Sequence, residues 1–191
     1  MKKYIVLVTF LCGFFAMGQG LLERNVGDFH EIKVYDLIEV NLIKSNDNKV
    51  MIKGPHANDI QLINKDGVLK VRMMLEKKFQ GENTFVEVYY KDLDVIDGNE
   101  GARITANELI AQTSLNLRVQ EGAEIRLGLE VDYLSSKAVT GGIIEVSGMI
   151  DVHDVNMNTG AILRAKELRS SITNIRLTAG GEAAIFATKR V

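Results

Sequence analysis

The sequence has very little cysteine, proline or tryptophan: one, one and none among 191 residues. The only cysteine, Cys12, lies in an apolar N-terminal run, so the rest of the chain has no disulfide and no thiol chemistry. No basic run is longer than a pair such as Lys77-Lys78 or Lys189-Arg190, a pattern that argues against nucleic-acid binding and against a polybasic membrane contact. Stability must therefore come from packing.

The N-terminus has the pattern of a secretory signal peptide. Two lysines precede the apolar run Tyr4–Phe15, and Ala16-Met17-Gly18 places small residues just before Gln19, the expected first mature residue. An uncleaved anchor is the alternative, but the run is shorter than the roughly 20 residues that span a bilayer. We predict a signal peptide over residues 1–18. The mature chain, 19–191, is then exported to the periplasm, the outer membrane or the cell exterior, with no transmembrane span.

Residues 19–95 show the alternation of apolar and polar side chains that is typical of half-buried strands. The apolar positions are Ile32, Val34, Ile38, Val40, Leu42, Val50 and Ile52, followed by the segment Phe85–Tyr90. Lys65-Asp66-Gly67 separates Ile60–Asn64 from Leu69–Leu75 and predicts a hairpin, because glycine accepts a positive φ at no steric cost. No long segment has helical periodicity. We expect N-terminal strands and one hairpin here.

The C-terminal half contains an internal repeat of about 20 residues. Its leading glycines are spaced 21, 19, 19 and 20 residues apart, at Gly101, Gly122, Gly141, Gly160 and Gly180. Three residues after each comes an apolar residue: Ile104, Ile125, Ile144, Leu163 and Ala183. Five before each stand Ile96, Leu117, Ser136, Val155 and Ile175, in which Ser136 is the polar exception.

A 20-residue unit is too small to bury its own apolar face. Stacking such units at the strand spacing of about 4.8 Å aligns equivalent residues into a shared core, with glycine at a corner. The pattern predicts an all-β fold, a right-handed parallel β-helix-like solenoid whose regular rungs cover residues 96–191. The alternative is a β-sandwich with evenly spaced hairpins. We expect Ile104, Ile125, Ile144 and Leu163 to form one buried column.

Several short motifs, taken in order, resemble the head GIN domain family of auto-transporter adhesins. They are Val26-Gly27-Asp28-Phe29, Tyr89-Tyr90-Lys91-Asp92-Leu93, Glu100-Gly101-Ala102, Ser147-Gly148, Asn156-Met157-Asn158-Thr159-Gly160 and Ala179-Gly180-Gly181-Glu182-Ala183. The resemblance covers Glu23 to Val191 and implies an exported β-helical protein with a role in surface adhesion. Family members usually continue with further rungs beyond the strand at residues 183–186.

Metal ligands are sparse in the sequence. Asp151 and His153 alternate along one strand, with Asp154 adjacent, but neighbouring repeats offer no further His or Cys, so we expect solvated surface here. His30 and His56 stand alone near turns. The stretch 97–101, Asp-Gly-Asn-Glu-Gly, resembles the start of a calcium loop but lacks its later ligands. We predict neither a metal nor another cofactor.

Catalytic motifs are equally weak. Ser147 lacks the flanking glycine of a nucleophile elbow, and Ser135-Ser136-Lys137 is not a Ser-x-x-Lys motif. Asp92 and Asp94 alternate with apolar residues as an exposed strand face would. We therefore expect no enzyme. The alternative is a carbohydrate-active enzyme of the polysaccharide-lyase β-helix type, which generally needs longer loops than these repeats allow.

The combined expectation is a non-catalytic, exported module of the cell envelope that binds an unknown surface glycan or protein. A further expectation concerns the C-terminal edge, because only four residues follow Ala187 and cannot form another rung. We expect the chain to self-associate through this edge, or to be less stable than a version with additional rungs.

Overall fold

The computed structural model describes residues 21–191, so the predicted signal peptide and its cleavage site lie outside the described residues. The described chain is all-β and contains two short 3₁₀ turns, η1 (Ala57–Asp59) and η2 (Leu75–Lys77). Its strands are β1 (Leu22–Asn25), β2 (Glu31–Val34), β3 (Glu39–Lys44), β4 (Lys49–Lys53), β5 (Ile60–Lys65), β6 (Val68–Met73), β7 (Phe85–Tyr90), β8 (Val95–Gly98), β9 (Arg103–Ala106), β10 (Ile110–Val119), β11 (Glu124–Ala138), β12 (Ile143–Met157), β13 (Ile162–Leu177) and β14 (Glu182–Arg190).

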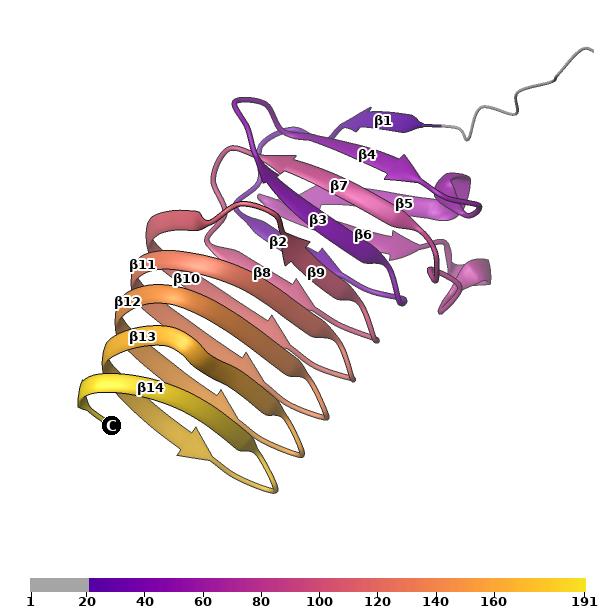
Figure 1. The fold of residues 1–191 in the computed structure, drawn as a ribbon. Coiled ribbons are helices and arrows are strands. Elements are labelled where there is room, and N and C mark those ends of the chain that lie inside the picture. Colours follow the sequence, from indigo (N-terminus) through magenta and orange to yellow (C-terminus); the bar gives the residue numbers. More distant parts are fainter. Residues whose placement is uncertain (1–20) are drawn as a thin grey trace, which may run out of the picture.

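The strands form a β-solenoid with rungs of about 20 residues, as the sequence repeat predicts (Figure 1). Two opposing layers face each other across the core. Sheet A contains β5, β6, β2, β8 and the C-terminal halves of β10 to β13. Sheet B contains β1, β4, β7, β3, β9 and the N-terminal halves of β11 to β14. Every pairing from β8 onward is parallel, which rules out a sandwich of hairpins.

The sharp corner between sheets A and B is where the repeat glycines lie. At each corner two successive residues have positive φ, for example Glu121 at 54° and Gly122 at 71°. The corner glycines from Gly101 to Gly160 also donate their backbone N–H to the next rung: Gly122 N lies 3.2 Å from Thr140 O, and Gly141 N lies 3.0 Å from Thr159 O. Glycine suits the second position because a left-handed backbone conformation strains other residues. These hydrogen bonds continue the ladder through the turn.

The predicted core column is confirmed. Ile125 pairs with Ile104 on one side and Ile144 on the other, and Ile144 pairs with Leu163. All four side chains are at most 1 % exposed. Burial of this regular apolar row between the two layers supplies the main favourable free energy of a fold that has no disulfide.

The N-terminal strands extend the same stack, in an order that differs from their order in the chain. β2 lies between β6 and β8, and β3 lies between β7 and β9, all in parallel. The corner of this rung has Asp36 and Leu37 at φ of 61° and 64°, and Leu37 N donates to Glu100 O at 3.0 Å. Because leucine stands at the glycine position, the repeat is invisible in the sequence at this rung.

The hairpin predicted around Lys65-Asp66-Gly67 is also present. β5 and β6 pair antiparallel on either side of it, and Asp66 and Gly67 both have positive φ, at 53° and 77°. On sheet B, β4 pairs antiparallel with both β1 and β7. The antiparallel strands therefore cover the N-terminal end of the stack, next to the two 3₁₀ turns (Figure 1).

The opposite end of the stack, beyond β13 and β14, exposes inward-facing residues. Leu177 occupies the position of the buried Met157 and Ala138 one and two rungs earlier, but it is 45 % exposed. Ile175, in register with buried Val155, is 37 % exposed. The interior of the solenoid is thus open to solvent at this edge. Among residues 21–191, no helix is long and apolar enough to cross a membrane.

A candidate binding groove on sheet B

The outer face of sheet B carries a groove that runs across the strands, along the axis of the solenoid. It consists of two hollows of about 770 and 980 Å³ that share Thr105 and Asn107 in their lining. The register places one outward residue from each of seven strands in a single row along it: Glu87, Asn41, Thr105, Arg126, Glu145, Arg164 and Ala184. Six strand spacings of about 4.8 Å give the row a length of roughly 29 Å.

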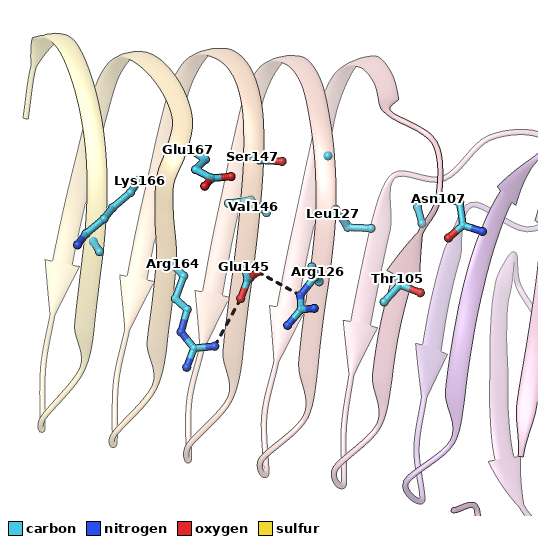
Figure 2. A pocket seen from close by; sticks show the side chains of 13 residues that line it. Thr105, Asn107, Arg126, Leu127, Glu145, Val146, Ser147, Arg164, Lys166 and Glu167 are labelled. Carbon is cyan, nitrogen blue, oxygen red and sulfur yellow. Dashed lines mark ion pairs between the residues drawn. The ribbon is translucent and has the colours of Figure 1, made fainter. Parts of the chain in front are cut away.

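Small residues make the hollow at the C-terminal end of the groove. Gly128 on β11 pairs with Ser147 on β12, and both line the hollow. Longer side chains rise beside them, including Lys166 and Glu167 from β13 (Figure 2). The depression therefore arises because two successive rungs have, at the same outward position, a glycine and a serine, whose side chains are absent or short.

Three charged side chains form a ladder along this hollow. The guanidinium of Arg126 lies 3.1 Å from one carboxylate oxygen of Glu145, and that of Arg164 lies 3.5 Å from the other (Figure 2). The three residues occupy the fourth position after Gly122, Gly141 and Gly160. An alignment of the outward positions of the repeat would have placed the three residues in one row, but it would not have shown that their side chains form ion pairs.

The N-terminal hollow has the same alternation of donors and acceptors. Lys53 Nζ lies 2.8 Å from Glu87 Oε1, and this contact raises the pKa of the lysine. Arg103 lies 3.7 Å from Glu39. The Phe85 ring, half exposed, adds an apolar surface to the lining. Hydrogen-bonding groups beside an exposed ring suit a ligand that combines hydroxyls with C–H faces.

The catalytic and metal candidates of the sequence do not come together in this groove. Ser147 lies in it, but no hydrogen bond joins its hydroxyl to a histidine within residues 21–191. Asp92 and Asp94 are exposed, as expected, and pair with Lys44 and His30. The described residues contain no group of three or more His, Cys, Asp or Glu side chains that could hold a metal ion.

The interpretation of Asp151 and His153 as neighbours on one solvated strand face is wrong. Asp151 is exposed, whereas His153 points into the core and is 1 % exposed. The strand bends between them, where Asp151 and Val152 both face outward, and this shifts the alternation by one residue. Burial lowers the pKa of His153 to about 4. The imidazole is therefore neutral at physiological pH.

The sequence also missed the partner of this histidine. His153 Nε2 lies 2.8 Å from Ser136 Oγ, and Ser136 is itself 1 % exposed. The only available signal was that Ser136 interrupts an otherwise apolar column. A serine–histidine pair can activate a nucleophile, but these two groups lie inside the core, where no substrate reaches them. Each side chain supplies the hydrogen-bond partner that the other needs in the core.

The stretch 97–101 forms a solenoid corner, as expected, and its polar groups are used internally. Asn99 Nδ2 donates to Asp97 Oδ1 at 3.0 Å, and Gln120 Nε2 donates to Asn99 Oδ1 at 2.6 Å. The second isolated histidine, His56, contacts Asp59 three residues later at 3.2 Å. These polar side chains stabilise turns.

Comparison with known families identifies the chain. Residues 28–191 match the family described as "Putative auto-transporter adhesin, head GIN domain". The chain belongs to this head GIN domain family. The match covers all the strands of the described structure except β1. The assignment to the family therefore rests on the whole solenoid and not on one motif. No curated protein matches the chain.

Solved structures show the same fold at low sequence identity. A crystal structure of a "putative adhesin" from Bacteroides fragilis is 13% identical, with a TM-score of 0.73 over 91% of this chain and 98% of that one. A "putative adhesin" from Parabacteroides merdae is 19% identical, with a TM-score of 0.67 over 87% and 80%. A "putative lipid binding protein" from Parabacteroides distasonis is 16% identical, with a TM-score of 0.62 over 88% and 82%.

Proposed function

We propose that this chain is an exported, non-catalytic binding module of the cell envelope, and that the groove on sheet B binds a linear, hydroxyl-rich glycan. Membership of a family described by adhesion supports a surface role. The N-terminal pattern of the sequence supports export.

The observation that carries the proposal is the continuous row across seven strands of sheet B. Its charges neutralise one another along the groove, since Glu145 lies between two guanidinium groups and Glu87 pairs with Lys53. A neutral glycan can donate hydroxyl protons to such carboxylates and accept from the guanidinium groups. The shape suits an extended polymer because the groove is long and open, without the enclosure of a small-molecule pocket.

A glycan array with the purified protein identifies a ligand, and a substitution then tests the groove. Ser147→Tyr fills the hollow beside Gly128, so we expect it to weaken binding of the array ligand by at least tenfold. The matched control is Ser114→Tyr, which places the same side chain on an exposed position of β10, outside the groove lining. Equal affinities for the two variants would exclude the groove as the binding site.

The same material separates binding from catalysis. The array ligand is incubated with the protein, with and without calcium, and the length of the polymer is followed by size-exclusion chromatography. We expect the polymer to keep its length. Chain shortening that is lost in a Glu145→Gln variant would replace the adhesion proposal with a carbohydrate-active enzyme.

A further inference from the structure

A second charged row lies on the outer face of sheet A, the layer opposite the groove. The register places one outward residue from each of seven strands in this row, and five of the seven are cations: Lys70, Lys33, Arg118, Lys137 and Arg176. The other two positions hold Asp97 and Asn156. We call these seven residues the basic stripe. In the sequence its members are scattered, so no basic run is visible.

The cations of the basic stripe differ in how far acidic side chains of the protein neutralise them. Lys33 lies 3.0 Å from Glu31 and 3.3 Å from Asp97, and Arg118 lies 3.7 Å from Glu31. By contrast, Lys70, Lys137 and Arg176 are exposed and make no ion pair within residues 21–191. These three cations are therefore free to meet an outside anion.

The neighbouring row on the same face contains mostly neutral polar groups. Asn116, Ser135, Asp154 and Asn174 follow one another across β10 to β13. Asp154, the anion in this row, accepts hydrogen bonds from the Tyr133 hydroxyl and, at 2.7 Å, from Asn174 Nδ2. These bonds hold its pKa below the usual range. The charge of Asp154 is thus already paired with donors of the protein, and the Asn116 amide and the Ser135 hydroxyl are left to bind a ligand.

We propose that the basic stripe binds a linear acidic polysaccharide, laid across the strands of sheet A. Cations that recur from strand to strand along one face match an anion that recurs along a polymer, and the adjacent Asn116 and Ser135 match the hydroxyls between the anions. The Tyr133 ring lies beside the neighbouring row with its hydroxyl bound to Asp154, but the row itself has no series of aromatic rings on which successive nucleic-acid bases could stack, and it is not the apolar face that enters a lipid surface. A glycan in the groove and a polyanion on the stripe would occupy opposite layers, so each can be tested without the other.

Polygalacturonate, which carries one carboxylate per sugar, is the probe, and its binding to the purified protein is measured by calorimetry. We expect binding that weakens as salt is added, because exposed charges are screened, and no binding of neutral dextran. The double variant Lys137→Gln with Arg176→Gln should bind about three- to tenfold more weakly. The matched control, Arg24→Gln with Lys189→Gln, removes the same charge from exposed positions elsewhere and should leave the affinity unchanged.

A variant that is expected to bind more tightly makes the test independent of folding defects, because a misfolded protein would lose affinity and not gain it. Asn156→Lys adds a cation between Lys137 and Arg176 and should tighten polygalacturonate binding by a few fold. The proposal is overturned if both double variants weaken binding equally, or if Asn156→Lys has no effect. It is also overturned if duplex DNA or phosphatidylglycerol vesicles bind more tightly than polygalacturonate. None of these outcomes bears on the sheet B groove, which Ser147→Tyr tests.

Discussion

Ser136 Oγ and His153 Nε2 lie 2.8 Å apart inside the solenoid, in a core that is mostly apolar and holds a second buried polar pair, Ser170 and Thr173, in the next rung. Ser136 occupies a column whose other buried members are Leu69, Ile32, Ile96, Leu117 and Val155. A buried hydroxyl without a partner is destabilising, and the neutral imidazole supplies that partner. The pair therefore makes part of the stability of the fold depend on the protonation state of one histidine.

This dependence predicts a loss of stability in mild acid. The pKa of His153 is about 4 in the folded chain, against 6.5 for an unperturbed histidine, so the unfolded chain binds the additional proton. Stability is thus complete above pH 6.5 and falls as the pH drops from 6.5 to 4, with about 2 kcal/mol lost by pH 5. Urea denaturation at pH 7.5 and pH 5 measures the difference.

The variant His153→Leu isolates this effect from the titration of carboxylates. It should abolish most of the loss between pH 7.5 and pH 5, whereas His30→Gln, at an exposed position, should leave the loss intact. Adding Ser136→Ala to His153→Leu removes the orphaned hydroxyl and should recover stability at pH 7.5. An unchanged pH dependence in His153→Leu would show that other groups control it.

The core column predicts a large cost for truncating Ile125. This side chain is fully buried between Ile104 and Ile144, so Ile125→Ala should destabilise the protein by about 2–5 kcal/mol. Leu177→Ala is the control, because Leu177 is 45 % exposed at the open end, and its cost should be clearly smaller. Chemical denaturation of both variants measures the costs, and equal values would contradict the stacking.

Two glycines with positive φ should differ in their tolerance of a side chain. At Gly148, with φ of 113°, an added Cβ would overlap the backbone oxygen of Leu129. At Gly141, with φ of 73°, the same atom meets nothing within 4 Å. Gly141→Ala should therefore cost about 1–2 kcal/mol, from backbone strain alone, and Gly148→Ala should cost more. Thermal melts rank the two variants, and the reverse order would contradict this account.

The open C-terminal edge predicts self-association of the purified 191-residue chain. Ile175 and Leu177 are inward-facing residues exposed there, beside strands with unpaired backbone groups. Sedimentation should show dimers or larger species that increase with concentration, and Leu177→Lys should shift the population toward monomer. The control Ile63→Lys, at an exposed residue on β5 at the other end, should leave association unchanged. A wild-type monomer at high concentration contradicts the prediction.

Much of the fold was predictable because a solenoid repeats its local chemistry. The glycine period located the corners at Gly101, Gly122 and Gly141, and the apolar residues three positions later predicted the buried column. The rung formed by β2 and β3 was not recognised as part of the stack, since Leu37 stands where later rungs have glycine. A single local substitution was enough to conceal one unit of the repeat.

The sequence by itself determined the period of the rungs, the positions that face the core and the absence of cysteine chemistry. Those properties follow from backbone alternation and from the conformational freedom of glycine, which are local. Only the tertiary structure decided that Arg126, Glu145 and Arg164 form a ladder, that Lys137 and Arg176 belong to one stripe and that His153 faces inward. Stacking brings together residues about 20 positions apart, and a bend in one strand reverses which face a side chain occupies. Both effects depend on the register between rungs.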